Sequence, residues 1–326
     1  MKLRVREDVF PIAGGFTISR GTRTESRVVT VELERDGVRG WAECYPYARY
    51  NETVESVIAE IQGQAGALAE GMDRIALQDT MRPGAARNGL DCAFWDWEAK
   101  SAGETAWELA GLAEPTPVIT AFTLSLEDPD VMRDKARANA HRPLLKIKLG
   151  GSGDIERLRA VREGAPDAKI IVDANEGWDA STYAEIAPVV LELGVAMVEQ
   201  PLPTSDDGPL AGMDRPLPVC ADEACHDRAS LPAIAGKYDM INIKLDKTGG
   251  LTEALALKAA AEAEGLKIMV GCMIGSSLGM APAVLVAQGC EVVDLDGPLL
   301  LAEDRANGLT YDAAGVVHPP AANLWG

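Results

Sequence analysis

The chain of 326 residues carries 31 Lys and Arg against 50 Asp and Glu, which gives a formal net charge of −19. This acidic balance argues against a nucleic-acid-binding protein and against docking on anionic lipid, because both depend on a basic surface. At 47% hydrophobic and 25% charged residues the composition excludes a wholly disordered chain, and the length fits one large barrel or two domains.

The first third of the chain has the pattern of an α+β module. Arg27–Glu34 is rich in β-branched residues and partly alternates, which predicts a strand. Asp36-Gly37 is typical of a tight hairpin turn, so we expect Val38–Glu43 to return antiparallel to the first strand. Apolar residues at steps of three and four then predict helices at Val54–Ala69 and Ala85–Ala99.

After a proline-containing break at Ala113–Val118, short apolar strands alternate with amphipathic helices. Eight such strands favour a closed parallel barrel of the TIM type over an open sheet. The predicted strands are Val118–Leu124, Leu144–Leu149, Lys169–Asp173, Met197–Glu199, Val219–Asp222, Met240–Lys244, Ile268–Cys272 and Val292–Asp296. Predicted helices between them are Ile155–Glu163, Tyr183–Leu193 and Glu253–Glu264.

This pattern predicts a capping domain over residues 1–113 and a barrel domain over residues 114–308. The turn-rich end of the chain, from about residue 309 to residue 326, is expected to pack back on the capping domain and complete it.

The sequence also indicates a compartment. Six scattered cysteines without a CxxC pair favour a reducing environment. The charged N-terminus lacks the apolar segment of a secretory signal, and the best apolar stretch, Ile186–Val198, is short and interrupted by Glu192. We therefore expect a soluble, cytoplasmic protein with no membrane or nucleic-acid partner.

Five predicted strands end in a charged residue, and successive positions are 22 to 26 residues apart, about one strand–helix unit. These residues are therefore expected together at the C-terminal mouth of the barrel. Three converging carboxylates repel one another unless a cation lies between them, and oxygen ligands without His or Cys favour Mg²⁺. A single acid could be a surface residue, but three in register between two lysines favour a site. The five residues are Lys148, Asp173, Glu199, Asp222 and Lys244.

The lysines indicate proton transfer. Lys146 and Lys148 share one face of a strand, while Lys148 and Lys244 approach the predicted metal from opposite sides. Lysine is a base only when neutral, and the positive charge of a metal and of Lys146 lowers its pKa. One lysine could then remove the proton next to a metal-bound carboxylate while the other returns a proton to the opposite face. Solvated lysines, or a salt bridge from Lys146 to a ligand acid, are the alternatives.

A set of motifs resembles the enolase superfamily, in its muconate-lactonizing-enzyme subgroup. The resemblance implies an α/β fold, a modified (β/α)7β TIM barrel with an α+β capping domain, and one Mg²⁺ per subunit. It assigns the metal to Asp173, Glu199 and Asp222 and the acid/base roles to Lys148 and Lys244. Asn175 and Glu223 are expected behind these ligands. The motifs are Lys146-Ile147-Lys148, Asp173-Ala174-Asn175, Glu199-Gln200-Pro201, Asp222-Glu223 and Asn242-Ile243-Lys244.

The last predicted strand places Asp294 and Asp296 on one face, where paired carboxylates would attract a substrate ammonium group. This pair resembles the DxD signature of the L-Ala-D/L-Glu epimerase group, as do the segments Asn242–Leu257 and Gly271–Ile274. The resemblance implies epimerisation of L-Ala-D-Glu and L-Ala-L-Glu by two-base 1,1-proton transfer through a metal-stabilised enediolate, a reaction suited to murein peptide recycling. A turn-capping role for either Asp is the alternative.

The side chain of such a substrate needs a counter-charge. The Gly- and Thr-rich segment Gly14–Thr24 offers Arg20 or Arg23 for a bidentate pair with the γ-carboxylate, and the sequence does not choose between them. Thr123 and Cys272 resemble substrate contacts, with packing roles as the alternative, and Lys146 is expected beside the substrate.

Other functions stay open at this stage. An N-acylamino acid racemase or an o-succinylbenzoate synthase of the same subgroup would use the same metal and lysines but would not need an ammonium site. A non-catalytic barrel that binds a metal or a ligand is a further alternative. Members of the family often form rings or dimers, so a homo-oligomer is an expected state.

Overall fold

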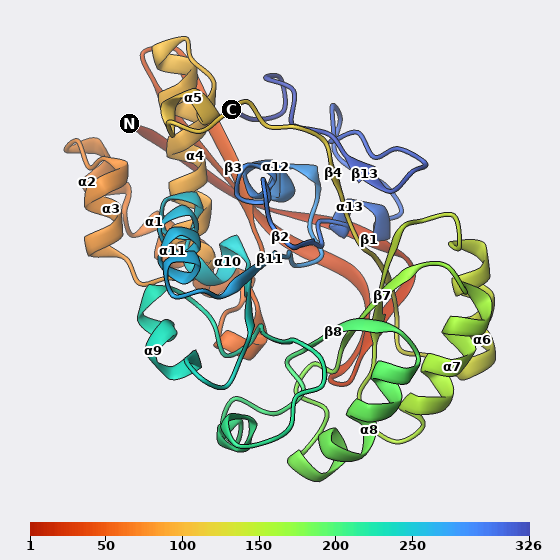
Figure 1. Cartoon of the computed structure of the whole chain (residues 1–326). Coiled ribbons are helices and arrows are strands. Elements are labelled where there is room, and N and C mark those ends of the chain that lie inside the picture. Colours follow the sequence, from red (N-terminus) through yellow and green to blue (C-terminus); the bar gives the residue numbers. More distant parts are fainter.

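A computed structural model describes residues 1–326, the whole chain (Figure 1). The chain begins with a three-stranded antiparallel sheet of β1 (Lys2–Ile18), β2 (Gly21–Arg35) and β3 (Val38–Cys44). Asp36 and Gly37 both have positive φ, as the predicted hairpin turn requires. The sequence pattern did not predict β1, because its half-exposed residues alternate between charged and apolar types without a buried run.

Helix α4 (Ala85–Ala102) packs against the capping sheet. The absence of a side chain at Gly40 lets α4 approach β3 closely, since a Cβ there would lie 2.4 Å from the carbonyl oxygen of Ala93. The single helix predicted at Val54–Ala69 is interrupted after Gly63, which ends the first helix. The helices of this part are α1 (Val54–Gln62), α2 (Ala65–Ala69), α3 (Arg74–Thr80), α4 (Ala85–Ala102) and α5 (Ala106–Leu109), with a short 3₁₀ turn, η1 (Ala48–Tyr50).

The rest of the chain forms an eight-stranded parallel sheet in the order β5 to β12. The sheet closes on itself, because the amide of Ala121 donates to the carbonyl oxygen of Val293 over 2.8 Å. The predicted α/β barrel fold is therefore confirmed. Its strands are β5 (Phe122–Leu124), β6 (Leu144–Lys148), β7 (Lys169–Asp173), β8 (Val195–Glu199), β9 (Val219–Ala221), β10 (Met240–Ile243), β11 (Lys267–Val270) and β12 (Val292–Val293).

Helices cover the outside of the barrel, with α6, α7 and α8 side by side on the flank away from the cap helices (Figure 1). These helices are α6 (Pro129–Ala138), α7 (Asp154–Gly164), α8 (Ala180–Glu192), α9 (Leu231–Ile234), α10 (Leu245–Thr248), α11 (Leu251–Ala263), α12 (Ser277–Val286) and α13 (Gly297–Leu300). Two 3₁₀ turns lie among them, η2 (Gly208–Ala211) and η3 (Arg228–Ser230). None of the helices in the molecule is long and apolar enough to cross a membrane.

The strand predicted at Val118–Leu124 is two strands. Its first part, β4 (Val118–Ile119), leaves the barrel and pairs antiparallel with β13 (Val316–Val317). The residues after β13 return to the capping sheet, where the indole of Trp41 donates to the carbonyl oxygen of Leu324 over 2.6 Å. The end of the chain thus contacts the cap, while the exact domain boundaries stay a prediction.

Candidate active site

The inside of the barrel is layered. Eight apolar side chains, one from each strand or its start, fill the lower layer: Ala121, Leu144, Ile171, Met197, Cys220, Met240, Met269 and Val292. Because strand side chains alternate, the residue two positions later points inward again, one layer nearer the C-terminal end. That layer is almost entirely polar and consists of Thr123, Lys146, Asp173, Glu199, Asp222, Asn242, Gly271 and Asp294. The change from apolar to charged residues therefore fixes where the chemistry lies.

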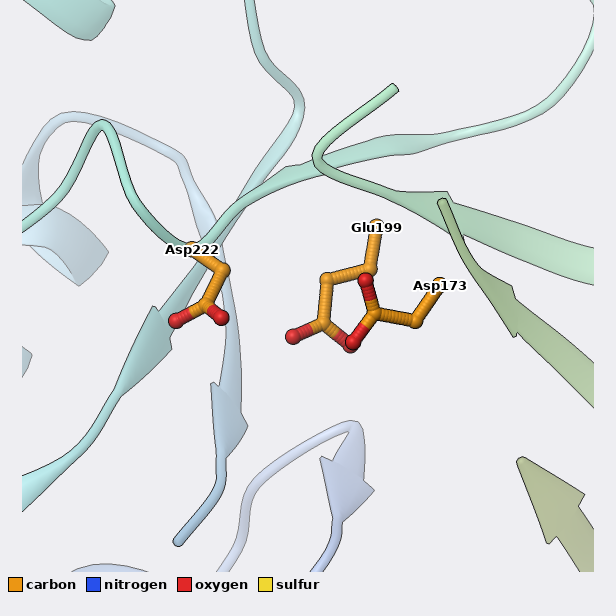
Figure 2. A group of neighbouring side chains, drawn as sticks. All are labelled: Asp173, Glu199 and Asp222. Carbon is orange, nitrogen blue, oxygen red and sulfur yellow. The ribbon is translucent and has the colours of Figure 1, made fainter. Parts of the chain in front are cut away.

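Three acids of this layer converge, and their side chains point toward one another (Figure 2). Asp173, Glu199 and Asp222 each offer a carboxylate oxygen within 4.8 Å of the others, and all three side chains are buried. Burial, followed by repulsion from Asp173, raises the pKa of Glu199. Burial also disfavours the charged form of Asp173, but Lys148 and Lys146 outweigh it and hold its pKa below the usual value. Three hard oxygen donors at this spacing fit a single Mg²⁺.

Two lysines flank the carboxylate cluster. Lys148 Nζ lies 2.6 Å from Asp173 Oδ2, and Lys244 Nζ lies 2.7 Å from Asp222 Oδ2. Lys148 ends β6 and Lys244 follows β10, four strands further around the eight-stranded barrel, so the two ammonium groups approach from opposite sides. Burial disfavours the charged form of Lys244, yet Asp222 and Glu199 dominate and raise its pKa.

A third lysine joins two parts of the site. Lys146 Nζ lies 3.2 Å from Asp173, 2.7 Å from Glu199 and 2.8 Å from Asp294. Burial alone would lower its pKa, but Asp294 and the other acids raise it well above the usual value. Lys146 is therefore a fixed cation between the cluster and the last strand. This is the ion pair with ligand acids that the sequence left open for this residue.

The last strand supplies a second acidic group. One carboxylate oxygen of Asp294, Oδ1, is buried without a hydrogen-bond partner. Asp296 accepts a hydrogen bond of 2.6 Å from the amide of Thr123, and burial together with the charge of Asp294 raises the pKa of Asp296 to about 7. An unsatisfied buried oxygen costs free energy unless a ligand donor reaches it. The pair can thus receive a cationic donor.

These groups surround one pocket that is open to solvent. Asp173 and Glu199 lie below its surface, where they are fully buried. The cap contributes Phe16, Ile18 and Tyr47 to its wall. The other residues predicted from the sequence for the site line the pocket: Arg20, Thr123, Lys146, Lys148, Asn175, Asp222, Glu223, Lys244, Cys272, Asp294 and Asp296.

The two candidate arginines have different surroundings. Arg20 donates to Glu223 over 2.8 Å, to the carbonyl oxygen of Asn175 over 2.8 Å and to the Tyr47 hydroxyl over 2.9 Å. Arg23 makes no ion pair. It donates to the Tyr45 hydroxyl, and its guanidinium carbon lies 5.6 Å and 5.3 Å from the ring centres of Tyr45 and Tyr47.

Sequence reasoning assigned no role to three supporting residues. Lys247 is buried and donates to Asp222 Oδ1 over 2.6 Å, on the opposite oxygen from Lys244. Asn242 donates to Glu199 over 2.8 Å, and its position two residues before Lys244 on the same face could have revealed it. The side chain of Gln200 accepts a hydrogen bond from the amide of Asp222 over 2.9 Å, and the backbone of Gln200 is left-handed (φ 35°). No spacing pattern in the sequence predicts this arrangement.

Comparison with known proteins agrees with this geometry. Residues 131–322 match the family described as enolase C-terminal domain-like, and residues 1–111 match the mandelate racemase / muconate lactonizing enzyme N-terminal domain. The L-Ala-D/L-Glu epimerase of Escherichia coli K12 is 45% identical over 97% of this chain and 99% of its own. The N-acetyl-D-glutamate racemase of a Pseudoalteromonas species is 43% identical over 88% and 91%.

Solved structures show the same likeness. An enolase family member from Agrobacterium tumefaciens, described as homologous to dipeptide epimerases, holds sodium and L-Ala-L-Glu with an ordered loop. It is 52% identical, covers 99% of both chains and superposes with a TM-score of 0.97. A dipeptide epimerase from Enterococcus faecalis, complexed with Mg and L-Leu-L-Tyr, is 28% identical over 99% of this chain and 98% of its own, with a TM-score of 0.92. This protein therefore belongs to the enolase superfamily, within the mandelate racemase and muconate lactonizing enzyme group, whose relatives here are epimerases and racemases.

Proposed function

We propose that this protein is a Mg²⁺-dependent isomerase of dipeptides that interconverts L-Ala-D-Glu and L-Ala-L-Glu. The observation that carries the proposal is one pocket lined by two lysines from opposite sides of the barrel, above three converging acids, with a second acidic pair after the last strand. The E. coli and A. tumefaciens relatives support the choice of this dipeptide.

Asp173, Glu199 and Asp222 would hold the metal. Bound there, Mg²⁺ would supply the positive charge that makes the proton next to a substrate carboxylate acidic. The magnesium in the E. faecalis relative supports this ion, as does a donor set made only of carboxylate oxygens.

Lys148 and Lys244 would move the proton. A substrate α-carbon between them presents one face to each ammonium group, because the lysines stand on opposite sides of the barrel. Bound Mg²⁺ would offset the charge of the acids that raise the pKa of Lys244, so one of the two lysines could be neutral. The neutral lysine would take the α-proton from its face, and the other, protonated, would donate a proton from the opposite face. The configuration of that carbon inverts, and the two lysines exchange protonation states.

The remaining polar groups would orient the dipeptide. Asp294 and Asp296 would accept the α-ammonium group, since Asp294 Oδ1 has no partner within the protein. Arg23 would receive the γ-carboxylate, because Arg20 is already paired with Glu223 whereas Arg23 has no acidic partner. Thr123 and Cys272 line the pocket and would contact the peptide.

A second candidate is racemisation of N-acetylglutamate, which the Pseudoalteromonas relative favours. That substrate has the γ-carboxylate but no ammonium group, so the two candidates differ at Asp294 and Asp296. The unpartnered buried oxygen of Asp294 favours the dipeptide.

The test is incubation of the protein with L-Ala-L-Glu and Mg²⁺ in D₂O, followed by proton NMR. Deuterium at the Glu α-carbon together with L-Ala-D-Glu is the expected result. N-acetyl-L-glutamate under the same conditions is the matched control. Exchange in the acetylated substrate alone would assign the second function, and exchange in neither would refute both. An enzyme with this activity would serve a cytoplasmic pathway that recycles murein peptides.

A further inference from the structure

The tip of the first hairpin is held in place by contacts with the barrel. We define the hairpin tip as residues 16–23, in which Phe16 pairs with Arg23, Thr17 with Thr22 and Ile18 with Gly21. The ladder between β1 and β2 is interrupted between Pro11 and Phe16. Gly14 and Gly15, in that interruption, both have positive φ and little around them. Two short strands alone are barely stable in water, so contacts with the barrel must fix the tip.

Those contacts come from three barrel segments. In Figure 1 the long red ribbon of β1 and β2 runs from the cap helices to the barrel. There the amide of Leu126 donates to the carbonyl oxygen of Thr17 over 3.0 Å. The Ser19 hydroxyl donates to the carbonyl oxygen of Asn175, also over 3.0 Å. Arg20 donates to the same Asn175 oxygen and to Glu223.

Arg20 pairs with two acids, and the pair with Glu223 at 2.8 Å is shorter and more buried than the pair with Glu176 at 3.4 Å. The Glu223 side chain is 1% exposed and follows the metal-cluster acid Asp222 directly, while Arg20 is 29% exposed. If the tip moved away, Glu223 would be a buried carboxylate without a cation, next to further acids. Removing one partner of such a pair is strongly unfavourable. Asn175 strengthens the same attachment, because its carbonyl oxygen accepts hydrogen bonds from both Ser19 and Arg20. The backbone of Asn175 is left-handed at this point (φ 46°).

We propose that Arg20 is a positioning residue: its ion pair with Glu223 fastens the hairpin tip to the barrel and thereby sets Arg23 at the pocket wall. The two arginines divide the work. Arg23 lines the pocket, and its guanidinium has no acidic partner. Arg20, by contrast, is already paired with an acid of the protein, Glu223. The loss of Arg20 should therefore loosen the whole tip and misplace Arg23 with it, whereas the loss of Arg23 should affect only an acidic substrate.

Hydrogen–deuterium exchange of the full-length protein without substrate tests the fastening directly. We expect R20M to speed exchange in peptides covering residues 16–23 by at least about tenfold, the loss of one charge-assisted contact. R27M is the matched control, because Arg27 lies on β2 outside the tip and pairs with Glu7 at the surface. E223Q should also speed exchange, and R20M/E223Q should exchange no faster than R20M. Unchanged exchange in R20M, or additive effects in the double variant, would overturn the proposal.

Kinetics supply an independent readout that rests on the proposed function. R20M should raise KM for both L-Ala-L-Glu and a dipeptide with an uncharged second side chain, and more for L-Ala-L-Glu because Arg23 is misplaced, with kcat little changed. R23M should raise KM for L-Ala-L-Glu alone. When R20M is added to R23M, KM should rise by the same factor for both dipeptides, because no Arg23 remains to be misplaced. A selective effect of R20M on the acidic dipeptide that persists without Arg23 would assign Arg20 to the substrate and refute its positioning role. If no dipeptide turns over, the proposed function fails, while the exchange result still decides the fastening.

Discussion

Lys146 and Asp294 form a buried ion pair of 2.8 Å although they lie 148 positions apart in the chain. The same ammonium group contacts Glu199 over 2.7 Å, so one cation connects the carboxylate cluster with the acidic pair of the last strand. A change in the charge of either acidic group therefore changes the electrostatic potential at the other.

Replacing Lys146 by Met should destabilise the protein. The change leaves Asp173, Glu199 and Asp294 buried without their shared cation, and loss of one partner from a buried pair costs about 3–5 kcal/mol. Chemical denaturation with and without Mg²⁺ measures this. The metal should recover part of the loss, because a cation bound only by the folded state adds to its stability. A variant as stable as the wild type, with no response to Mg²⁺, would contradict the arrangement.

Removing either flanking lysine should abolish epimerisation but not all proton exchange. K148A retains Lys244, and K244A retains Lys148. Each variant should therefore exchange the α-proton of only one epimer, and the two variants should act on different epimers. We expect epimerisation to fall by more than about 100-fold, as for loss of a general base. Proton NMR in D₂O with each pure epimer measures both quantities. Exchange of both epimers by one variant would show that the lysines do not act on separate faces.

Substitution of Asp294 by Asn should discriminate between substrates. The carboxylate is expected to contact the ammonium group of a dipeptide, a group that N-acetylglutamate lacks. D294N should therefore lower kcat/KM for L-Ala-L-Glu by at least about tenfold more than for N-acetyl-L-glutamate, the worth of one charged hydrogen bond. An equal loss on the two substrates would indicate that Asp294 acts only through Lys146.

Dipeptide turnover should depend on pH through Asp296, whose pKa burial and Asp294 raise to about 7. Below that pH the carboxyl group is neutral and attracts an ammonium group less, so kcat/KM should fall as pH drops from 8 to 6. The D296N variant, which cannot titrate, should lose this component of the profile. A D296N profile that keeps the same slope would assign the dependence to another group.

Asp246 should make stability depend on pH in the opposite sense from an ordinary ion-paired acid. Burial raises its pKa to about 7, above the 3.8 of the unfolded chain. Between these values the folded state binds the extra proton, so stability falls as pH rises, by at most about 1.4 kcal/mol per pH unit from this group. Above about pH 7 the penalty is constant.

The D246N variant tests this sign. An Asn oxygen can accept the same two hydrogen bonds, from the amide of Tyr45 and from Asn88, without ever ionising. Its stability advantage over the wild type should grow from pH 4 to pH 7 and then level off in denaturation experiments. An advantage independent of pH would contradict the raised pKa.

Much of the site could be predicted because the barrel repeats. Each strand–helix unit brings its inward side chain to the same height, so the interval between Asp173, Glu199 and Asp222 is enough to place them together. The alternation within a strand likewise places Lys146 and Lys148 on one face. These are local regularities that a single sequence displays.

The rest of the site depends on contacts between distant segments. Arg20 meets Glu223 across 203 positions, and no periodicity relates the cap hairpin to the loop after β9. Lys247 reaches Asp222 because α10 turns sharply after Lys244, a path set by tertiary packing. The β1 strand was missed for a similar reason: its alternation of charged and apolar residues has meaning only beside β2.

The four-strand offset between β6 and β10 has a consequence for how such an enzyme can change. Half of an eight-stranded barrel lies between the two lysines, so inversion at a carbon held between them follows from strand order alone. The residues that would select the side chain, by contrast, stand on the hairpin of a separate sheet. Stereochemical outcome and substrate choice are therefore encoded in different parts of the chain. Mutation could alter the range of accepted peptides and leave the inversion itself intact.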